Sequence, residues 1–361
     1  WSGAAERDIR DTDVTYFRRI VEEPFRPWAS SPFAASGPGH RIAKSVHGEV
    51  RLLDAFSSGS SSSSSACPCG SFAAVAKVVP NDMVERSRAR EANERRAWLC
   101  DGDFPPMEDL RTEAAVLMYL QKSSLERSPY VIQAMGAFQD EAFSYLVTEY
   151  CEGGELFARV AYGDPLSEVE KKRCTAQLLQ AVQHLHGRNV GHRDISLENI
   201  LLRDGDCVLM DFGQAVRLRS VEGKQLRYFA EAGKRMYRSP EMYVPRQKEV
   251  QVVCPSDAKP GAVAQVSYDK CRCEVLLPPD AVPGQPCAAE PSGYAAAPAD
   301  IFACGVCAFV LTVGKPPWAV ARDADPTFSF VRRHGVSMLL KQWRGGAAPA
   351  PGAGEEEGLL A

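Results

Sequence analysis

The sequence lacks a long uninterrupted apolar run, and it lacks an excess of charge of either sign. Its longest apolar stretch, near Ile301 to Val313, is broken by Gly305 and Thr312, so no membrane span is predicted. A formal net charge of −4 and a sequence pI near 6.0 argue against nucleic acid or an anionic membrane as the main partner. With 45% hydrophobic and 24% charged residues among 361, the composition suits one large globular domain or two lobes.

The sequence also lacks an initial methionine and a recognisable disulfide framework. It begins with Trp1, so we expect a segment of a longer chain, and its start gives no information on compartment. Twelve cysteines are scattered along the chain. Four of them gather in one stretch, where a metal site or disulfides and plain reduced thiols are both open readings. These four are Cys254, Cys271, Cys273 and Cys287.

The most informative stretch runs from Gly191 to Asn199 and reads Gly-His-Arg-Asp-Ile-Ser-Leu-Glu-Asn. Twelve residues beyond Asn199 stands Asp211, at the head of an Asp-Phe-Gly motif. Two short apolar runs lie between them, and the Asp-Gly pair at 204–205 that separates these runs predicts a β-hairpin. The pattern therefore predicts one potential base, Asp194, and two potential metal ligands, Asn199 and Asp211, at the mouth of one cleft.

A lysine in an apolar strand is the second informative feature. Residues 72–79 are almost entirely apolar except Lys77, and a buried ammonium needs a carboxylate or phosphate partner because an unpaired buried charge is costly. Apolar periodicity predicts a helix over 107–121. Glu113 lies at the edge of its apolar face and can pair with Lys77. Glu108 is the rival by charge, although its place near the helix start suits the helix dipole in any case.

The loop and the Asp-Phe-Gly motif resemble the catalytic loop (H-R-D-x-x-x-x-N) and the metal-binding motif (D-F-G) of eukaryotic protein kinases. Residues 195–198 lack the Ala/Arg-rich insert of tyrosine kinases, so the resemblance is to the Ser/Thr type. It extends over about residues 40–343. It implies an α+β, bilobal fold with a small β-rich N-lobe and a larger, mainly helical C-lobe.

The resemblance also divides the chain, with insertions where composition becomes biased or periodicity is lost. We expect an N-terminal extension over 1–39, an N-lobe over 40–150 with a serine-rich low-complexity insertion at 57–70 and a charged surface insertion at 81–106, a C-lobe over 151–343 with an insertion of no sustained period at 244–296, and a linker or truncated C-lobe end over 344–361. Within the C-lobe, Ser167 and Glu170 form a predicted capping box for a helix that runs to His186.

The resemblance implies ATP and Mg²⁺ as cofactors and assigns roles to the matching positions. Asp194 would be the catalytic base, and Asn199 and Asp211 would hold the metal. Lys77, fixed by Glu113, would orient the α- and β-phosphates. The residues expected at the nucleotide are Ala43, Ser45, Gly48, Val50, Val75, Lys77, Thr148, Glu149, Cys151, Glu155, Leu201 and Asp211.

Among these nucleotide residues, the phosphate-covering loop departs from the G-x-G-x-x-G-x-V pattern. Ala43 and Ser45 stand where the first two glycines belong, and only Gly48 and Val50 match. The β-carbons of Ala43 and Ser45 restrict the conformation of the loop, so we expect it to bind phosphate more weakly. In the segment that joins the lobes, Thr148 corresponds to the gatekeeper, the main chain of Glu149 and Cys151 would bind adenine, and Glu155 would reach ribose or a basic substrate residue.

Two further departures concern charge near Asp194. Ser/Thr kinases usually carry a lysine two residues after the catalytic aspartate, where this chain has Ser196, and a threonine after the glycine of the substrate loop, where it has Lys234. The two positions face each other across the cleft in the family. We therefore expect Lys234 to be a catalytic residue that supplies the missing cation. The alternative is that Lys234 contacts an acidic substrate.

The predicted function is transfer of the γ-phosphoryl group of ATP to Ser/Thr hydroxyls of protein substrates. The alternative is a pseudokinase or weakly active nucleotide-binding scaffold that regulates partner proteins. Arg193 could dock a phosphate on the activation segment, with Ser220 and Tyr228 as candidate sites. The insertions and the Gly-Lys substrate motif resemble divergent protist kinases of the apicomplexan FIKK-like or rhoptry-like kind. We expect a cytoplasmic protein or, alternatively, one secreted into a host cell or parasite vacuole; the oligomeric state is not predicted.

Overall fold

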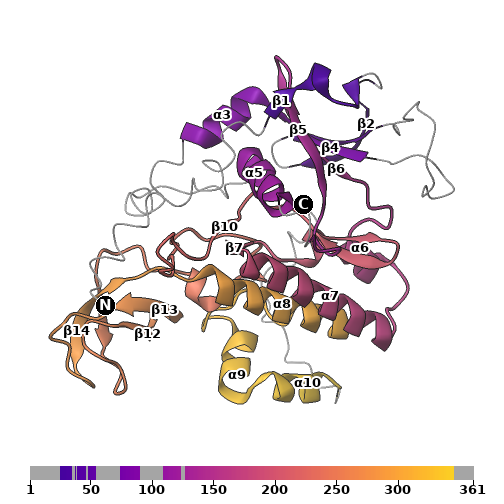
Figure 1. Ribbon diagram of the computed structural model, residues 1–361. Helices are drawn as coiled ribbons and strands as arrows, with labels where there is room; N and C mark the ends of the chain where they lie inside the picture. Colours follow the sequence, from indigo (N-terminus) through magenta and orange to yellow (C-terminus); the bar gives the residue numbers. More distant parts are fainter. Residues whose placement is uncertain are drawn as a thin grey trace.

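The computed structural model of this chain describes residues 25–34, 37, 39–45, 48–53, 74–89, 109–122 and 127–344. These residues form two lobes, a sheet-rich N-lobe and a larger, mainly helical C-lobe (Figure 1). The expected serine-rich insertion at 57–70, residues 90–106 of the second insertion, residues 1–24 of the extension and the tail after 344 lie outside the described residues. The predicted α+β, bilobal class is confirmed.

The N-lobe is built on one six-stranded sheet in the order β1-β5-β6-β4-β3-β2. Its strands are β1 (Phe25–Pro27), β2 (His40–Ser45), β3 (Gly48–Leu53), β4 (Ala74–Pro80), β5 (Ala134–Gln139) and β6 (Phe143–Glu149). Along β4, Ala74, Ala76 and Val78 are buried on one face, and the residues between them are half-buried on the other. This alternation is the period of two that places Lys77 on the face opposite that core.

The described part of the N-terminal extension packs on this lobe. Strand β1 pairs in parallel with β5 at the edge of the sheet, and a 3-10 turn, η1 (Trp28–Ser30), follows it. The indole of Trp28 stacks on Tyr145 with ring centroids 4.3 Å apart and meets Phe138 edge-on. Large aromatic rings bury much apolar area, so the extension covers the outer face of the sheet.

Two helices accompany the sheet. The first residues of the expected charged insertion at 81–106 form helix α3 (Asn81–Ala89), in which Val84 is buried. The second is α5 (Leu110–Gln121), which begins after the N-cap Asp109. The Asp109 carboxylate accepts the Arg111 and Thr112 amides, which is why the helix starts later than predicted.

The C-lobe is assembled around helices α7 and α8. Its helices are α6 (Leu156–Tyr162), α7 (Glu168–Gly187), α8 (Ala296–Val313), α9 (Pro326–His334) and α10 (Val336–Arg344). Its short elements are β7 (Val190–Gly191), η3 (Leu197–Asn199), β8 (Ile200–Arg203), β9 (Asp206–Leu209), β10 (Val216–Arg217) and η4 (Pro240–Met242). The predicted capping box of Ser167 and Glu170 is present at the start of α7, and the predicted Asp-Gly hairpin joins β8 to β9.

Helix α8 is the one described helix long and apolar enough to span a membrane by length and composition. It packs against α7 inside the C-lobe, and 56% of its 18 residues are buried. Core helices pass the same test, so this is weak evidence for a span. Within α8, Ile301 is exposed. Cys304 and Cys307, spaced as C-x-x-C, are both buried free thiols within it.

The insertion at 244–296, whose sequence shows no sustained period, forms a sheet. Its strands β11 (Val250–Val253), β12 (Val263–Tyr268), β13 (Cys271–Leu276) and β14 (Pro286–Pro291) have the order β11-β14-β13-β12. Figure 1 shows this insertion sheet in orange beside the start of α8. Each strand spans only 4–6 residues, so alternation such as buried Val250 and Val252 is too brief to stand out as a period.

The clustered cysteines belong to this insertion sheet. Cys254, Cys271 and Cys273 are buried, Cys287 is half-buried, and all four are free thiols. Within the part of the chain that the structure describes, no group of three or more His, Cys, Asp or Glu side chains could hold a metal. The thiols therefore act as small apolar core groups here.

We predict that Gly48→Ala destabilises the N-lobe. A β-carbon at residue 48 would lie 1.9 Å from the Val78 carbonyl oxygen, so β3 would have to move away from β4. The free energy of unfolding should fall by about 2 kcal/mol, measured by denaturant titration. Gly187→Ala is the control, because its β-carbon meets no atom within 4 Å; equal unfolding midpoints for both variants would contradict the prediction.

Candidate active site

The main chain of the catalytic loop (residues 191–199) is held by Asp300 of helix α8. One Asp300 oxygen accepts the His192 amide at 2.9 Å and the other accepts the Arg193 amide at 2.8 Å. The imidazole of His186 lies 2.9 Å from the same carboxylate. Arg193 has a φ of 66°, a strained value that persists only where the surroundings enforce it. Sequence reasoning missed Asp300, although a lone acid in an apolar helix was a usable signal.

Asp194 is fixed on several sides. The Asn199 side-chain amide donates to the Asp194 carbonyl at 2.7 Å and to its carboxylate at 3.0 Å. The Lys234 main-chain amide donates to the other carboxylate oxygen at 3.1 Å. Burial raises the pKa of the Asp194 carboxyl, against the lowering effect of Lys234 and His192. The carboxylate is therefore oriented by donors, and its affinity for a proton is increased.

Lys77 joins the two lobes electrostatically. Its ammonium lies 2.9 Å from the Glu113 carboxylate on α5 and 3.4 Å from Asp211. The predicted Lys77–Glu113 pair is thus present, whereas the rival Glu108 lies outside the described residues. Burial would raise the pKa of Asp211, but Lys77 and then His192 outweigh it and hold the pKa below its ordinary value. Asp211 consequently remains an anion.

A main-chain hydrogen bond brings the two expected metal ligands, Asn199 and Asp211, close to each other. The Met210 amide donates to the Asn199 carbonyl at 2.9 Å, and the ring of His192 contacts the Met210 carbonyl at 3.0 Å. Each ligand already faces an ammonium group, since Lys234 donates to Asn199 Oδ1 at 3.1 Å and Lys77 lies beside Asp211. A carboxylate and an amide oxygen are hard donors that fit Mg²⁺.

Five of the predicted nucleotide residues share one face of the N-lobe sheet. Val50 pairs with Lys77, Val75 with Thr148, and Ala43 with Val50. Directly opposed residues point to the same face, as do residues two apart along a strand. This face carries Lys77 as its charged group, so an apolar surface adjoins a cation, as an adenine base and its phosphates require.

The segment after β6 places the other predicted nucleotide residues. The Glu149 carboxylate accepts the Arg203 guanidinium at 2.6 Å and the Gln133 amide at 3.0 Å, so its side chain is structural and leaves only main-chain atoms for a ligand. Burial raises the pKa of the Cys151 thiol to about 12, which keeps it neutral. Glu155 stands at the N-cap position of helix α6 without a side-chain capping bond, and its main chain forms an isolated β-bridge with Leu201, which joins the segment to the C-lobe side of the site.

Strands β2 and β3 pair with each other on either side of the phosphate-covering loop. Ser45 pairs with Gly48, and Ala43 adjoins a register irregularity in β2. Gly48 lies close against the main chain of β4. The retained glycine therefore serves strand packing, which the motif pattern did not indicate.

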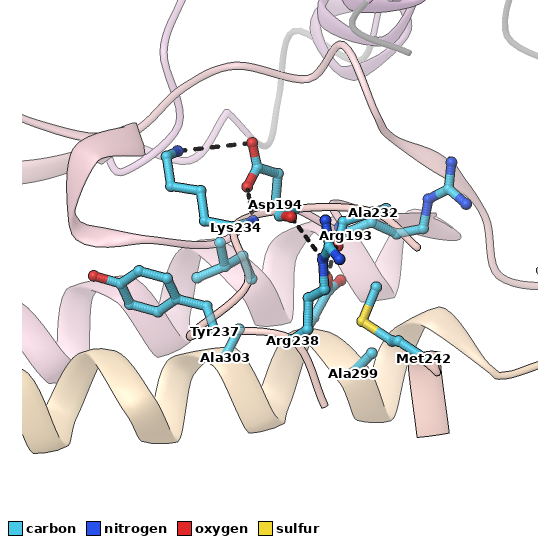
Figure 2. A pocket seen from close by; sticks show the side chains of 12 residues that line it. Arg193, Asp194, Ala232, Lys234, Tyr237, Arg238, Met242, Ala299 and Ala303 are labelled. Carbon is cyan, nitrogen blue, oxygen red and sulfur yellow. Dashed lines mark hydrogen bonds and ion pairs between the residues drawn. The ribbon is translucent and has the colours of Figure 1, made fainter. Parts of the chain in front are cut away.

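Lys234 faces Ser196 in the structure, as predicted. Its ammonium donates to Ser196 Oγ at 3.0 Å and lies 3.8 Å from the Asp194 carboxylate. Figure 2 shows Lys234 and Asp194 above helix α8. The dashed lines between them mark the hydrogen bond from the Lys234 main-chain amide and the ion pair of its ammonium group, both to the Asp194 carboxylate. The Lys234 ammonium, from the substrate loop (residues 233–238), thus lies beside Ser196, the position where Ser/Thr kinases usually carry a lysine.

Gln214 is a second residue that sequence reasoning missed. Its side-chain carbonyl accepts the Gly233 amide at 2.9 Å, and its amide nitrogen lies 3.5 Å from the Asp194 carboxylate. Gly233 has a φ of 75°, and a β-carbon there would lie 2.5 Å from the Arg193 carbonyl oxygen. Gln214 and Gly233 therefore bring the substrate loop against Asp194. In the sequence, only its position directly after Asp-Phe-Gly marked Gln214.

The expected phosphorylation sites are a correction. Ser220 and Tyr228 are both buried, and the Tyr228 hydroxyl donates to the Arg217 carbonyl at 2.6 Å. A hydroxyl that is buried and hydrogen-bonded cannot reach another enzyme's active site without local opening. Neither residue is an accessible acceptor in this conformation.

We predict that Asp300→Asn destabilises the catalytic loop. The amide would place an NH₂ donor against one of two buried main-chain N–H groups, leaving it unsatisfied. The free energy of unfolding should fall by about 3 kcal/mol, measured by denaturant titration. Asp257→Asn, an exposed acid of the insertion, is the matched control, and an Asp300→Asn midpoint equal to wild type would refute the account.

A comparison with family models agrees with this geometry. The model described as protein kinase domain matches residues 70–254, which is 185 of the 361 residues. The match begins after the phosphate-covering hairpin and contains Lys77, Glu113, Asp194, Asn199 and Asp211. It ends in the insertion sheet, before helix α8. With half of its length matched, together with the lobes and the site described above, this chain belongs to the protein kinase domain family.

Proposed function

We propose that this protein kinase domain is active and transfers the γ-phosphoryl group of ATP to serine or threonine hydroxyls of protein substrates. One observation carries the proposal, the bonded arrangement of the reactive groups. Lys77 contacts both Glu113 and Asp211, while Asp194 is bonded to Asn199 and Lys234. Phosphoryl transfer requires mainly positioning and charge neutralisation, and this arrangement supplies both.

Asp194 acts on the attacking hydroxyl. Its carboxylate is held by Asn199 and by the Lys234 amide, so the free lone pairs have a fixed direction. Burial raises the pKa of the carboxyl, which makes it a stronger acceptor for the hydroxyl proton than an exposed aspartate. A fixed base with a raised pKa lowers the barrier to proton removal as the new P–O bond forms.

The remaining groups neutralise phosphate charge. Lys77, held by Glu113 at 2.9 Å, orients the α- and β-phosphates. Asn199 and Asp211 would hold Mg²⁺, which supplies positive charge to the phosphate oxygens when bound. Lys234, beside Ser196 and 3.8 Å from Asp194, provides a cation next to the base, where the transferred phosphoryl group gathers charge.

The preference for serine and threonine rests on the catalytic loop. Residues 195–198 lack the Ala/Arg-rich insert of tyrosine kinases. Buried Ser196 and half-buried Lys234 contact each other beside Asp194 instead. We therefore propose aliphatic hydroxyls as acceptors.

A nucleotide-binding scaffold is the second candidate function. Ala43 and Ser45 replace two glycines of the phosphate loop. In addition, the Lys234 ammonium donates to Asn199 Oδ1 at 3.1 Å, the atom that would bind Mg²⁺. If Lys234 does not yield that oxygen, nucleotide binds without transfer, and heat stabilisation by ATP without labelled product would identify this case.

We further propose a place among divergent protist kinases of the FIKK-like or rhoptry-like kind. The serine-rich run, the insertion sheet and the Gly-Lys substrate motif support it. Such a protein acts in the cytoplasm or, after secretion, in a host cell or parasite vacuole. Immunolocalisation in the source cells distinguishes these compartments.

We predict that Asp194→Asn abolishes transfer while nucleotide binding persists. Loss of the base should lower the turnover of labelled phosphate from ATP to a generic protein substrate by about a thousandfold. Stabilisation against heat by Mg²⁺-ATP should remain, since Lys77 and Asp211 are intact. Asp204→Asn in the β8–β9 turn is the matched control. A turnover in Asp194→Asn equal to that of wild type would exclude Asp194 as the catalytic base.

We predict that Lys234→Ala lowers turnover by about a hundredfold, with the KM for ATP changed much less. The double variant Ser196→Lys/Lys234→Thr returns the cation to the catalytic loop and should recover most of this loss. Steady-state kinetics at saturating ATP provides the measurement.

Arg235→Ala is the control for the alternative that Lys234 contacts an acidic substrate, because Arg235 is the exposed neighbour in the same loop. That alternative predicts a raised KM for protein substrate with unchanged turnover in Lys234→Ala. Such a result, or unchanged kinetics, would remove Lys234 from the catalytic step.

A further inference from the structure

Tyr294, near the end of the insertion, packs against the activation segment (residues 211–241). Its side chain is 0% exposed. Its main chain exchanges two hydrogen bonds with Tyr228, of 2.8 and 2.9 Å. Its hydroxyl donates to the Ala230 carbonyl at 2.9 Å and accepts from the Arg193 guanidinium at 3.3 Å. One tyrosine thus connects the insertion, the activation segment and the catalytic loop.

The activation segment is packed there as a small hydrophobic core. Its apolar side chains bury themselves against the residues that follow the insertion sheet. The cluster contains Val216, Leu226, Tyr228, Phe229, Ala232, Met242, Val244, Tyr294, Ala296 and Ala299. Burial of these apolar side chains stabilises the ordered segment without the charge that phosphorylation would add.

The insertion sheet braces the same segment from its outer side. Arg227 forms an ion pair with Glu274 of β13, and the Glu274 carbonyl accepts the Ser292 amide at 2.9 Å. A β-carbon on Gly293, whose φ is 75°, would lie 2.6 Å from the Tyr228 carbonyl oxygen. Only glycine permits this approach, so Gly293 allows the main-chain pairing between Tyr294 and Tyr228.

Arg193 is engaged by neutral protein groups. Its Nε donates to the Gln214 carbonyl at 2.9 Å, and its guanidinium lies over the Tyr228 ring, 5.0 Å from the centroid. The Tyr294 hydroxyl is a further partner. These contacts occupy the arginine that precedes the base, in the place where a phosphate on the segment would otherwise bind.

The activation segment also presents no accessible acceptor for such a phosphate. It contains four hydroxyl side chains, all of them in described residues and none more than 6% exposed; they are Ser220, Tyr228, Tyr237 and Ser239. Modification of any of them requires the segment to open first.

We propose that Tyr294 is a positioning residue that holds Arg193 and the activation segment in the catalytic geometry without phosphorylation. The insertion sheet anchors it through Arg227 and Glu274. This inference rests on the proposed kinase activity for its catalytic consequence, whereas the ordering of the segment stands apart from catalysis.

The first test compares the full chain before and after phosphatase treatment, with intact mass confirming removal of phosphate. Initial rates of label transfer from ATP to a generic protein substrate should agree within twofold. A tenfold slower rate after treatment, regained as phosphate appears on the 211–241 peptide, would overturn the proposal.

The second test is Tyr294→Phe, which removes the hydroxyl and keeps the ring and the main-chain bridge. A hydrogen bond to a charged group supports a drop in kcat of about tenfold, with the KM for ATP unchanged because Lys77 and Glu113 are untouched. Amides of residues 226–238 should exchange hydrogen faster. Tyr268→Phe on β12 of the same insertion is the control, and wild-type kcat and exchange in Tyr294→Phe would overturn the proposal.

A failure of the proposed function is recognised separately. If neither treated nor untreated wild type transfers label, kinase activity is refuted, and hydrogen exchange alone tests whether Tyr294 holds the activation segment. Unphosphorylated wild type should then protect residues 226–238, and both Tyr294→Phe and Gly293→Ala should lose that protection. Equal exchange in wild type and both variants would overturn the proposal that Tyr294 holds the segment.

Discussion

The rest of the site depends on one buried carboxylate, Asp300. It accepts two consecutive main-chain amides of the catalytic loop and so sustains the positive φ of Arg193, a conformation that L side chains adopt only at a cost. Helix α8 can fix that position because it is packed against α7 in the centre of the C-lobe. The direction of Asp194, one residue further on, follows from this attachment.

Charge is the second constraint, and it couples the base to the activation segment. Lys77 lies between the carboxylates of Glu113 and Asp211, so one ammonium group faces both anions. On the other side, the cation beside Asp194 comes from Lys234. Because Lys234 belongs to the substrate loop, the charge balance at the base holds only while that loop stays in place. The packing around Tyr294 keeps it there.

Much of the fold and of the site could be predicted from local sequence, since motifs report residues that are near in sequence or fixed in order. The β8–β9 hairpin, the Ser167–Glu170 capping box and the Lys77–Glu113 pair are present as predicted. The insertion sheet could not be predicted, because its short strands show no sustained period. Gln214 was missed because its contacts depend on distant residues.

The sequence by itself determined which side chains the site contains: an aspartate in the catalytic loop, an asparagine and a second aspartate with oxygen donors, a strand lysine, and a lysine at position 234 where position 196 has a serine. Only the tertiary structure decided which groups meet. The Tyr294 hydroxyl reaches Arg193 across 101 residues of sequence, and Asp300 reaches it across 107. No local pattern specifies such contacts, because burial in a shared core, not chain proximity, brings these side chains together.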